Sequence, residues 1–190
     1  HVRSRRQRQM CIRDRVIAGC AEALASFGPG TAEVVEAVNF NDPIQTVIAG
    51  TKAAVGKACE VLKAAGAKRA LPLPVSAPFH SSLMKPAAEK LRMALAGVAL
   101  AAPQIPVVNN VDVAVQQDAD AIREALYRQA FGPVRWVECV HALKARGVTH
   151  IIECGPGKVL AGLTKRIDPE LVGAALFDSA TLAETRELLA

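Results

Sequence analysis

Apolar residues recur along the chain at spacings that predict helices alternating with strands. One helix face runs from residue 88 to residue 98, where apolar side chains recur every three or four positions, and Pro86 is typical of a first helical turn. The residues on this face are Ala88, Leu91, Leu95 and Val98. Further helices are predicted over residues 16–27, 51–65, 118–129 and 136–146, with an apolar turn at 159–163. Strands are predicted over residues 34–39, 46–49, 68–73, 103–108 and 150–154.

The order of these elements predicts an α/β fold in two parts. Residues 16–75 follow the order α-β-β-α-β, which is a ferredoxin-like β-α-β-β-α-β unit lacking its first strand. That strand lies inside the sheet of such a unit, so we expect its loss to leave neighbouring backbone groups unpaired. Residues 76–190 alternate strands and helices. We expect them to form part of an α/β-hydrolase-like parallel-sheet domain, with residues 16–75 as the inserted small subdomain.

The positive charge of the chain is concentrated at its start. The formal net charge is +5, and residues 1–15 alone contain six arginines and one aspartate, so the remaining residues are neutral in sum. A basic segment can bind phosphates, but this one has no interleaved aromatic residues and no recognisable nucleic-acid-binding motif. We interpret residues 1–15 as a disordered arm foreign to the fold, and we expect no specific nucleic-acid partner.

Composition excludes several other classes of protein. Hydrophobic residues make up 51% of the chain and aromatic residues 4%, so the core is built from Ala, Val, Leu and Ile. No stretch approaches the roughly 18 unbroken apolar residues of a membrane span. The five cysteines are widely spaced and form no C-x-x-C pair, which favours reduced thiols in the cytoplasm over a disulfide framework or a zinc site. We expect a monomer without metal or cofactor.

The candidate for chemistry is His80, in the proline-rich stretch from Leu71 to Pro86. A predicted strand precedes it and a proline-initiated helix follows it. Rigid backbone on both sides would fix the imidazole, as a general base requires. A histidine that only caps or packs a loop is the alternative. The serine that such a base would serve is not evident, because the sequence contains no G-x-S-x-G and neither Ser81 nor Ser82 stands in such a motif.

Other polar positions have structural interpretations. His141 and His150 fall on a predicted helix surface and at a strand start, and we interpret both as structural. Gly155-Pro-Gly-Lys158 lacks the first glycine and the hydroxyl of a phosphate-binding loop, so a strand-to-helix turn explains it better. Asn39 and Asn41 fall at a hairpin tip, where asparagine commonly forms turns.

Six blocks of sequence resemble one enzyme family. They are Val38–Asn41 (VNFN), Gln45–Gly50 (QTVIAG), Ala64–Ser76 (AAGAKRALPLPVS), His80 with Leu83–Pro86 (LMKP), Pro106–Asp112 (PVVNNVD) and Glu153–Leu160 (ECGPGKVL). Together they resemble the malonyl-CoA:acyl-carrier-protein transacylases, from about Val16 to the C-terminus. The resemblance implies a ping-pong transfer in fatty-acid synthesis, in which a serine takes malonyl from malonyl-CoA and the phosphopantetheine thiol of acyl carrier protein removes it.

The resemblance also assigns the catalytic residues. His80 matches the family's general base, which withdraws the serine proton and later the thiol proton. Gln129 matches the position whose main-chain carbonyl orients that imidazole. Without the resemblance, Asp112 is our candidate for the orienting group.

Substrate contacts follow from the same resemblance. Asn39 and Asn41 match residues that line the active-site cleft from the small subdomain. Phe79 resembles the malonyl-selecting form of related polyketide acyltransferases, in which bulk beside the histidine disfavours a methyl branch. Such steric selection is worth about 1–3 kcal/mol per methyl group. Exposed basic residues could help to dock an acidic carrier protein, namely Lys68, Arg69, Lys165 and Arg166.

The chain departs from the family pattern in one respect. The family's G-Q-G-S oxyanion segment, its G-H-S-x-G serine and the arginine that pairs with malonyl do not occur in these residues. We therefore expect a catalytically inactive fragment of an acyltransferase. The alternatives are an acyltransferase module of a polyketide synthase, and a non-catalytic binder of carrier protein or nucleic acid that uses the basic arm.

Overall fold

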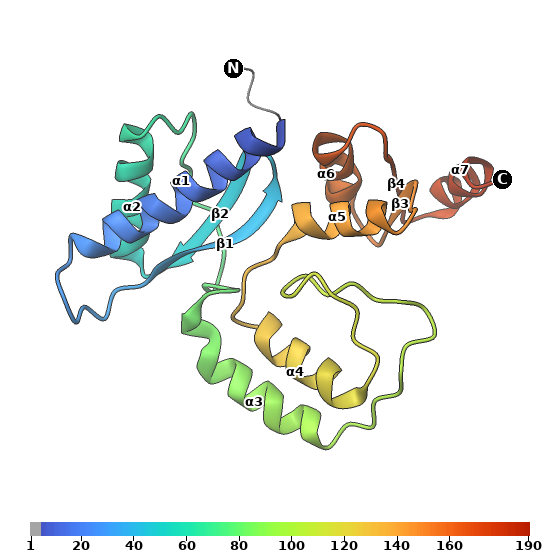
Figure 1. Cartoon of the computed structure of the whole chain (residues 1–190), viewed down its shortest axis with the longest axis horizontal. Coiled ribbons are helices and arrows are strands. Elements are labelled where there is room, and N and C mark those ends of the chain that lie inside the picture. The colour runs from blue at the N-terminus through green and yellow to red at the C-terminus, as the bar shows by residue number, and fades with distance from the viewer. Residues whose placement is uncertain (1–4) are drawn as a thin grey trace. The chain divides into compact units, whose positions relative to one another are not determined.

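The computed structural model describes residues 5–190, with side chains described from residue 12 onward. Figure 1 shows a mixed α/β chain with one small antiparallel and one small parallel sheet. The chain divides into two compact units, residues 1–136 and residues 137–190. Residues 76–136 belong to one compact unit with the hairpin and its helices, and the subdomain boundary at residue 75 stays a prediction.

A β-hairpin covered by two helices begins the first unit. β1 (Val35–Asp42) pairs antiparallel with β2 (Gln45–Gly50), and α1 (Arg5–Ala25) and α2 (Lys52–Ala64) pack against them (Figure 1). Their shared core consists of small side chains, as the composition requires: Cys20, Ala23, Val35, Ala54 and Ala58. The predicted hairpin is therefore confirmed, although β1 continues through the predicted turn to Asp42.

The start of the chain differs from our expectation. We expected residues 1–15 to be disordered, but α1 begins at Arg5. Residues 5–15 contain neither glycine nor proline, so nothing in their sequence stops the helix. Arg13 also stacks its guanidinium over the ring of Phe40 in β1, with 4.4 Å to the ring centroid. Residues 5–15 are thus helical and not disordered, whereas their being foreign to the fold stays a prediction, and residues 1–4 lie outside the described part.

Two predicted strands do not form. Residues 68–73 lie in an irregular segment in which Leu71, Leu73 and Val75 are exposed. Residues 103–108 contribute only one bridge, between Val108 and Val115. An apolar run becomes a strand only when another strand accepts its backbone hydrogen bonds. Within residues 5–190, no strand lies beside either segment.

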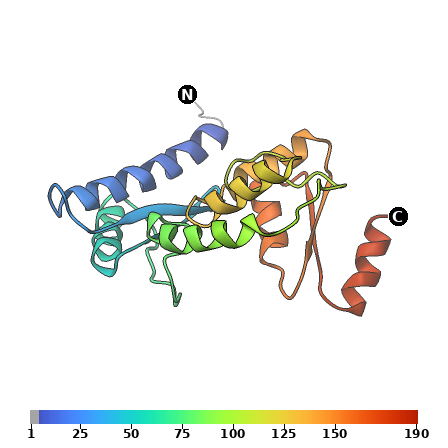
Figure 2. The same ribbon diagram turned by 90° about the horizontal axis from the view of Figure 1, so that it is seen from below.

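Two helices complete the first unit. After a short 3-10 turn, η1 (Ser82–Met84), come α3 (Lys85–Ala96) and, further along the chain, α4 (Ala119–Gln129). Figures 1 and 2 show α3 and α4 side by side. The hydroxyl of Tyr127 donates to Glu89 Oε1 at 2.5 Å across this pair. Both helices were predicted, and the Asp118 carboxylate accepts the Ala121 N–H at 2.8 Å and caps α4.

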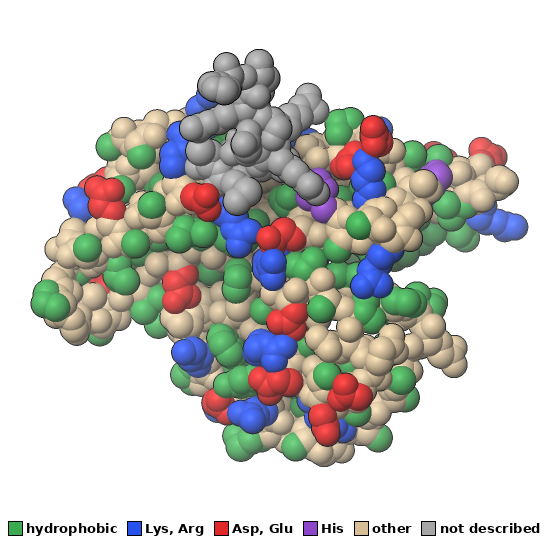
Figure 3. Space-filling model, in the orientation of Figure 1, with side chains coloured by type: hydrophobic (Ala, Val, Ile, Leu, Met, Phe, Trp, Pro, Cys, Tyr) green, Lys and Arg blue, Asp and Glu red, His purple; other side chains and the backbone are tan. Residues whose placement is uncertain are grey.

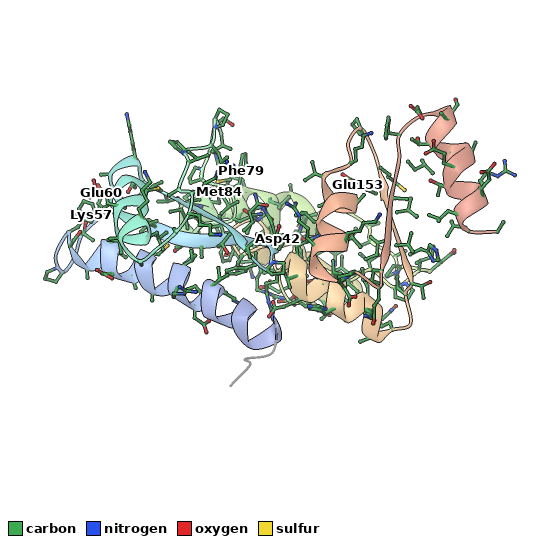
Figure 4. All side chains as sticks on the ribbon, turned by 90° about the horizontal axis from the view of Figure 1, so that it is seen from above. Asp42, Lys57, Glu60, Phe79, Met84 and Glu153 are labelled. Carbon is green, nitrogen blue, oxygen red and sulfur yellow. The ribbon has the colours of Figure 1, made fainter. Side chains whose placement is uncertain are left out.

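The second unit contains the parallel sheet. Its elements are α5 (Trp136–Ala145), β3 (His150–Cys154), α6 (Val159–Ile167), β4 (Val172–Leu176) and α7 (Ser179–Leu188). β3 and β4 pair in parallel, and α6 packs on both. Glu153, labelled in Figure 4, accepts the Ala161 N–H at 2.9 Å and so anchors the start of α6 after the Gly-Pro-Gly turn. No element was predicted for residues 168–190, where the structure has β4 and α7.

None of the described helices is long and apolar enough to cross a membrane. Four cysteines with described side chains, Cys20, Cys59, Cys139 and Cys154, are free thiols. Burial raises the pKa of Cys20 to about 11, with smaller contributions from Cys59 and Glu36. Among the described residues, no group of three or more His, Cys, Asp or Glu side chains is placed to hold a metal ion.

Candidate active site

His80 lies in the turn between the proline-rich segment and η1. Its φ is +64°, in the left-handed region that costs a non-glycine residue about 1–3 kcal/mol. The carbonyl of Pro78 accepts two hydrogen bonds from the fully buried Ser81, one from its N–H at 3.3 Å and one from its hydroxyl at 2.6 Å. These contacts hold the turn in its strained conformation, and the imidazole is positioned with it.

The imidazole reaches the end of α4. His80 Nδ1 lies 3.0 Å from the main-chain oxygen of Gln129. Gln129 is the last residue of the helix, and its carbonyl would ordinarily accept the N–H of the residue four positions later. That residue is Pro133, which has no N–H. The local sequence therefore leaves this carbonyl available to the histidine.

This contact determines which ring nitrogen carries the proton. A carbonyl oxygen only accepts hydrogen bonds, so Nδ1 must donate. In the neutral imidazole the lone pair is then on Nε2. No described atom forms a hydrogen bond with Nε2. Nε2 is thus the ring nitrogen of His80 that can accept a proton, while Nδ1 is held by the Gln129 carbonyl.

Strand β1 holds the segment that follows Gln129. The N–H of Val134 donates to Val38 O at 2.7 Å, and the N–H of Phe40 donates to Val134 O at 2.9 Å. Asn39, between these two residues, forms a parallel bridge with Val134. The segment that follows Gln129 is therefore fixed to β1.

Asp112 was our candidate orienting group without the resemblance, and that hypothesis was wrong. Arg128 Nη2 donates to Asp112 Oδ2 at 2.6 Å. This hydrogen bond is the main cause of the raised pKa of Arg128. The carboxylate thus pairs with a guanidinium, whereas the oxygen on His80 Nδ1 belongs to Gln129. Sequence spacing alone could not distinguish the two, because both arrangements depend on how α4 packs.

The predicted substrate-binding residues differ in how far their side chains are exposed to solvent. Asn39 and Asn41 are half-buried on β1. Phe79, labelled in Figure 4, is 51% exposed and immediately precedes His80. The structure brings Asn39 to Val134 and His80 to Gln129, while the roles of Asn39, Asn41 and Phe79 in binding stay predictions.

A surface pocket of about 610 Å³ is lined by other residues, all between positions 27 and 60. It is lined by Phe27, Lys52, Ala53, Gly56, Lys57 and Glu60. Lys57 and Glu60, labelled in Figure 4, form an ion pair at 3.2 Å on the surface of α2. None of the predicted site residues lines this pocket, so the hydrogen-bonded histidine defines the candidate site.

One contact at this site was not anticipated from the sequence. Glu36 Oε2 accepts the N–H of Ser82 at 2.8 Å, across 46 positions of sequence. No local motif signals such a contact, because it depends on the fold of β1 against the turn.

Comparison with known proteins identifies close relatives. The malonyl CoA-acyl carrier protein transacylase of Salmonella typhimurium is 58% identical over 151 residues, which are 80% of this chain and 49% of the relative. The Escherichia coli K12 transacylase is 56% identical over 156 residues, 82% of this chain and 50% of the relative. The chain therefore spans about half the length of these relatives, and matches their C-terminal part. No family model matches it.

Solved structures show the same likeness. An acyl-carrier-protein S-malonyltransferase from Burkholderia pseudomallei has a TM-score of 0.86 and 67% identity, over 92% of this chain and 55% of that one. A type II PKS acyl-carrier protein in complex with its malonyl-transacylase gives a TM-score of 0.87 and 50% identity, over the same shares.

Proposed function

We propose that this chain, which is homologous to the malonyl CoA-acyl carrier protein transacylases over 80% of its length, carries the histidine half of a malonyl-transfer site. The observation that carries the proposal is the 3.0 Å contact between His80 Nδ1 and the main-chain oxygen of Gln129. It presents Nε2 as a proton acceptor without any carboxylate partner. His80 and Gln129 are thus the proposed catalytic residues, with Gln129 acting through its backbone.

In the proposed reaction His80 acts twice. Nε2 first takes the proton of a serine hydroxyl as that oxygen attacks the thioester carbonyl of malonyl-CoA, and it then gives this proton to the departing coenzyme A thiolate. In the second half, Nε2 takes the proton of the carrier protein's thiol, whose sulfur attacks the malonyl-serine ester, and it gives the proton to the serine oxygen as the ester bond breaks. The Gln129 carbonyl keeps Nδ1 protonated and stabilises the imidazolium in both halves.

The serine itself is not among residues 1–190, which contain no G-x-S-x-G. We therefore propose that these residues alone transfer no malonyl. We also propose the finer fold assignment, in which residues 16–75 form an incomplete ferredoxin-like subdomain of an α/β-hydrolase-like domain. The paired hairpin with two helices on one face supports this assignment.

Proposed partners and location follow from the same likeness. We propose malonyl-CoA and acyl carrier protein as substrates, with Asn39, Asn41 and Phe79 lining the binding site. The relative in complex with a type II PKS carrier favours such a carrier as the second candidate. The free thiols of the described cysteines support a cytoplasmic location.

Binding of nucleic acid by the basic arm is the weaker alternative. Figure 3 shows Lys and Arg side chains interspersed with Asp and Glu on the described part of the visible face. Phosphate binding requires positive charge gathered on one surface. The described part of this face shows no such gathering of positive charge.

A chimaeric enzyme tests the proposed function. The N-terminal half of the Salmonella relative, which this chain does not span, would be joined to the chain, and malonyl transfer to acyl carrier protein measured. We expect the chimaera to be active and His80→Ala to lower kcat by about 10²–10⁴-fold, the usual contribution of a general base. The matched control is His150→Ala, whose imidazole contacts Thr149 Oγ1 in the other unit and should change the rate little.

Two results would contradict the proposal. One is full activity of a folded His80→Ala chimaera. The other is malonyl transfer by residues 1–190 alone at a rate comparable with the chimaera, since that would require a nucleophile other than the missing serine.

A further inference from the structure

We propose that Glu36 is a positioning residue for His80, acting through the Ser82 N–H. Its carboxylate is on β1, and Oε2 accepts that N–H at 2.8 Å, two residues beyond the histidine. The inference rests on the proposed function only in so far as His80 is a base; the positioning itself concerns this chain alone.

The Ser82 N–H has its acceptor outside the turn. Ser81 is the N-cap of η1, and an N-cap side chain accepts the N–H of the second or third helical residue, not that of the first, which is Ser82. Here the Ser81 hydroxyl instead donates to the Pro78 carbonyl at 2.6 Å, and it caps nothing. Glu36 supplies the acceptor that the local sequence does not.

Position along β1 lets Glu36 reach the turn. The preceding residue, Val35, is 4% exposed and packs in the core with α1 and α2. Neighbouring side chains of a strand point to opposite faces, so Glu36 projects from the other face of the hairpin. Its carboxylate meets the turn there, at the Ser82 N–H.

Strand β1 therefore holds both the His80 turn and the segment that follows Gln129. Glu36 ties the His80 turn to β1 by its side chain. The backbone of β1 ties down Val134, which follows Gln129 by five residues, through bonds of 2.7 and 2.9 Å. Since β1 holds both segments, loss of the Glu36 contact should let Nδ1 move away from the Gln129 oxygen. A base that is misplaced by a small distance loses much of its effect.

The test is nitrogen NMR of the His80 imidazole in the whole 190-residue chain, in alkaline buffer where the ring is neutral, assigned with His80→Gln. In the wild type we expect two well-separated ring-nitrogen resonances, with the proton on Nδ1. Glu36→Ala should bring them closer together, as the second tautomer becomes populated. Glu36→Gln retains a side-chain oxygen acceptor and should restore most of the separation.

Two further variants make the result specific. Glu33→Ala removes a neighbouring carboxylate that binds the Thr51 hydroxyl, and should leave the resonances unchanged. Ser82→Pro removes the N–H that Glu36 accepts and keeps the Glu36 carboxylate. The backbone of Ser81, with φ −102° and ψ 165°, is one that a following proline permits. It should reproduce the Glu36→Ala spectrum, and it replaces that variant if Glu36→Ala does not fold.

The outcomes separate this inference from the proposed function. Unchanged imidazole resonances in folded Glu36→Ala or Ser82→Pro would overturn the positioning role, whatever the chimaera does. Equal shifts in Glu33→Ala would also overturn it, because they would show a general loosening of the hairpin. A tautomer change in Glu36→Ala together with an active His80→Ala chimaera would leave the positioning intact and overturn the catalytic proposal.

Discussion

At the residue scale, the site depends on main-chain groups as much as on side chains. His80 is held at a φ of +64°, and the atom it contacts is a backbone oxygen. The identity of Gln129 as glutamine therefore matters less than the absence of an N–H at Pro133. A motif search that looks only for polar side chains would select Asp112, which the structure pairs with Arg128.

This distinction leads to a prediction about two substitutions. Gln129→Ala keeps the carbonyl and should leave the rate of the chimaera and the His80 tautomer unchanged. Pro133→Ala introduces an N–H that can compete for the Gln129 oxygen, because the Gly132 N–H already bonds the Arg128 carbonyl in helical fashion at 2.7 Å. We expect Pro133→Ala to lower kcat by up to about tenfold, since a neutral hydrogen bond contributes about 0.5–1.5 kcal/mol. The reverse order of effects would show that the Gln129 side chain is the active group.

At the element scale, local pattern was sufficient for most helices, although not for α7, and insufficient for isolated strands. α3 and α4 were predicted because their residues carry the apolar period, and Pro86 marks the start of α3. Residues 68–73 have an equally apolar sequence but remain irregular, since a strand requires a neighbour at hydrogen-bonding distance. The exposed Leu71 and Leu73 are the consequence of that missing pair.

The end of β2 gives a prediction at this scale. A Cβ on Gly50 would lie 1.9 Å from the Val34 carbonyl oxygen, so Gly50→Ala requires the backbone to shift. We expect the free energy of unfolding to fall by about 3 kcal/mol, at the upper end of overpacking costs. Gly56→Ala is the matched control, since Gly56 lies inside α2 with nothing within 4 Å of the added Cβ.

Gly56→Ala should stabilise the chain by about 0.5–1 kcal/mol, because alanine loses less backbone entropy in a helix than glycine does. Denaturant unfolding of both variants provides the measurement. Similar effects from the two substitutions would contradict the close approach at Gly50.

At the scale of the whole molecule, contacts between distant segments decide the compact units. Val134 joins β1, and this pairing keeps residues 76–136 with the hairpin in the first unit. In the second unit, Lys144 on α5 donates to Asp168 Oδ2 at 2.6 Å and to Glu170 Oε2 at 2.5 Å, which ties α5 to the end of α6.

This cluster predicts a pH dependence. The hydrogen bond from Lys144 is the main reason that the pKa of Asp168 lies below its ordinary value. A depressed folded-state pKa gives a stabilisation that is present above the unfolded pKa, about 3.9, and is lost as pH falls through the folded value. The pKa of Lys144 is raised, chiefly by the same bond, so its contribution is lost only as pH rises above about 10.4.

Asp168→Asn should therefore lower the Tm near neutral pH and reduce the loss of Tm between about pH 5 and the acid range. Lys144→Met removes the cause of the pKa shift and should reduce that loss similarly. Thermal unfolding across this pH range tests both variants. An acid dependence of Tm as steep as that of the wild type in Asp168→Asn would contradict the assignment.

The sequence by itself determined most of the helices, the hairpin, the family likeness and the choice of His80, because those features lie in short stretches whose residue types have local physical meaning. The family resemblance also indicated the Gln129 carbonyl, but only the tertiary structure decided that this oxygen lies 3.0 Å from His80 Nδ1, that Asp112 belongs to Arg128, and that Glu36 caps the His80 turn. Each of these contacts joins atoms from segments far apart in the chain. Their distances are set by the packing of β1 and α4, which no local spacing of residues encodes.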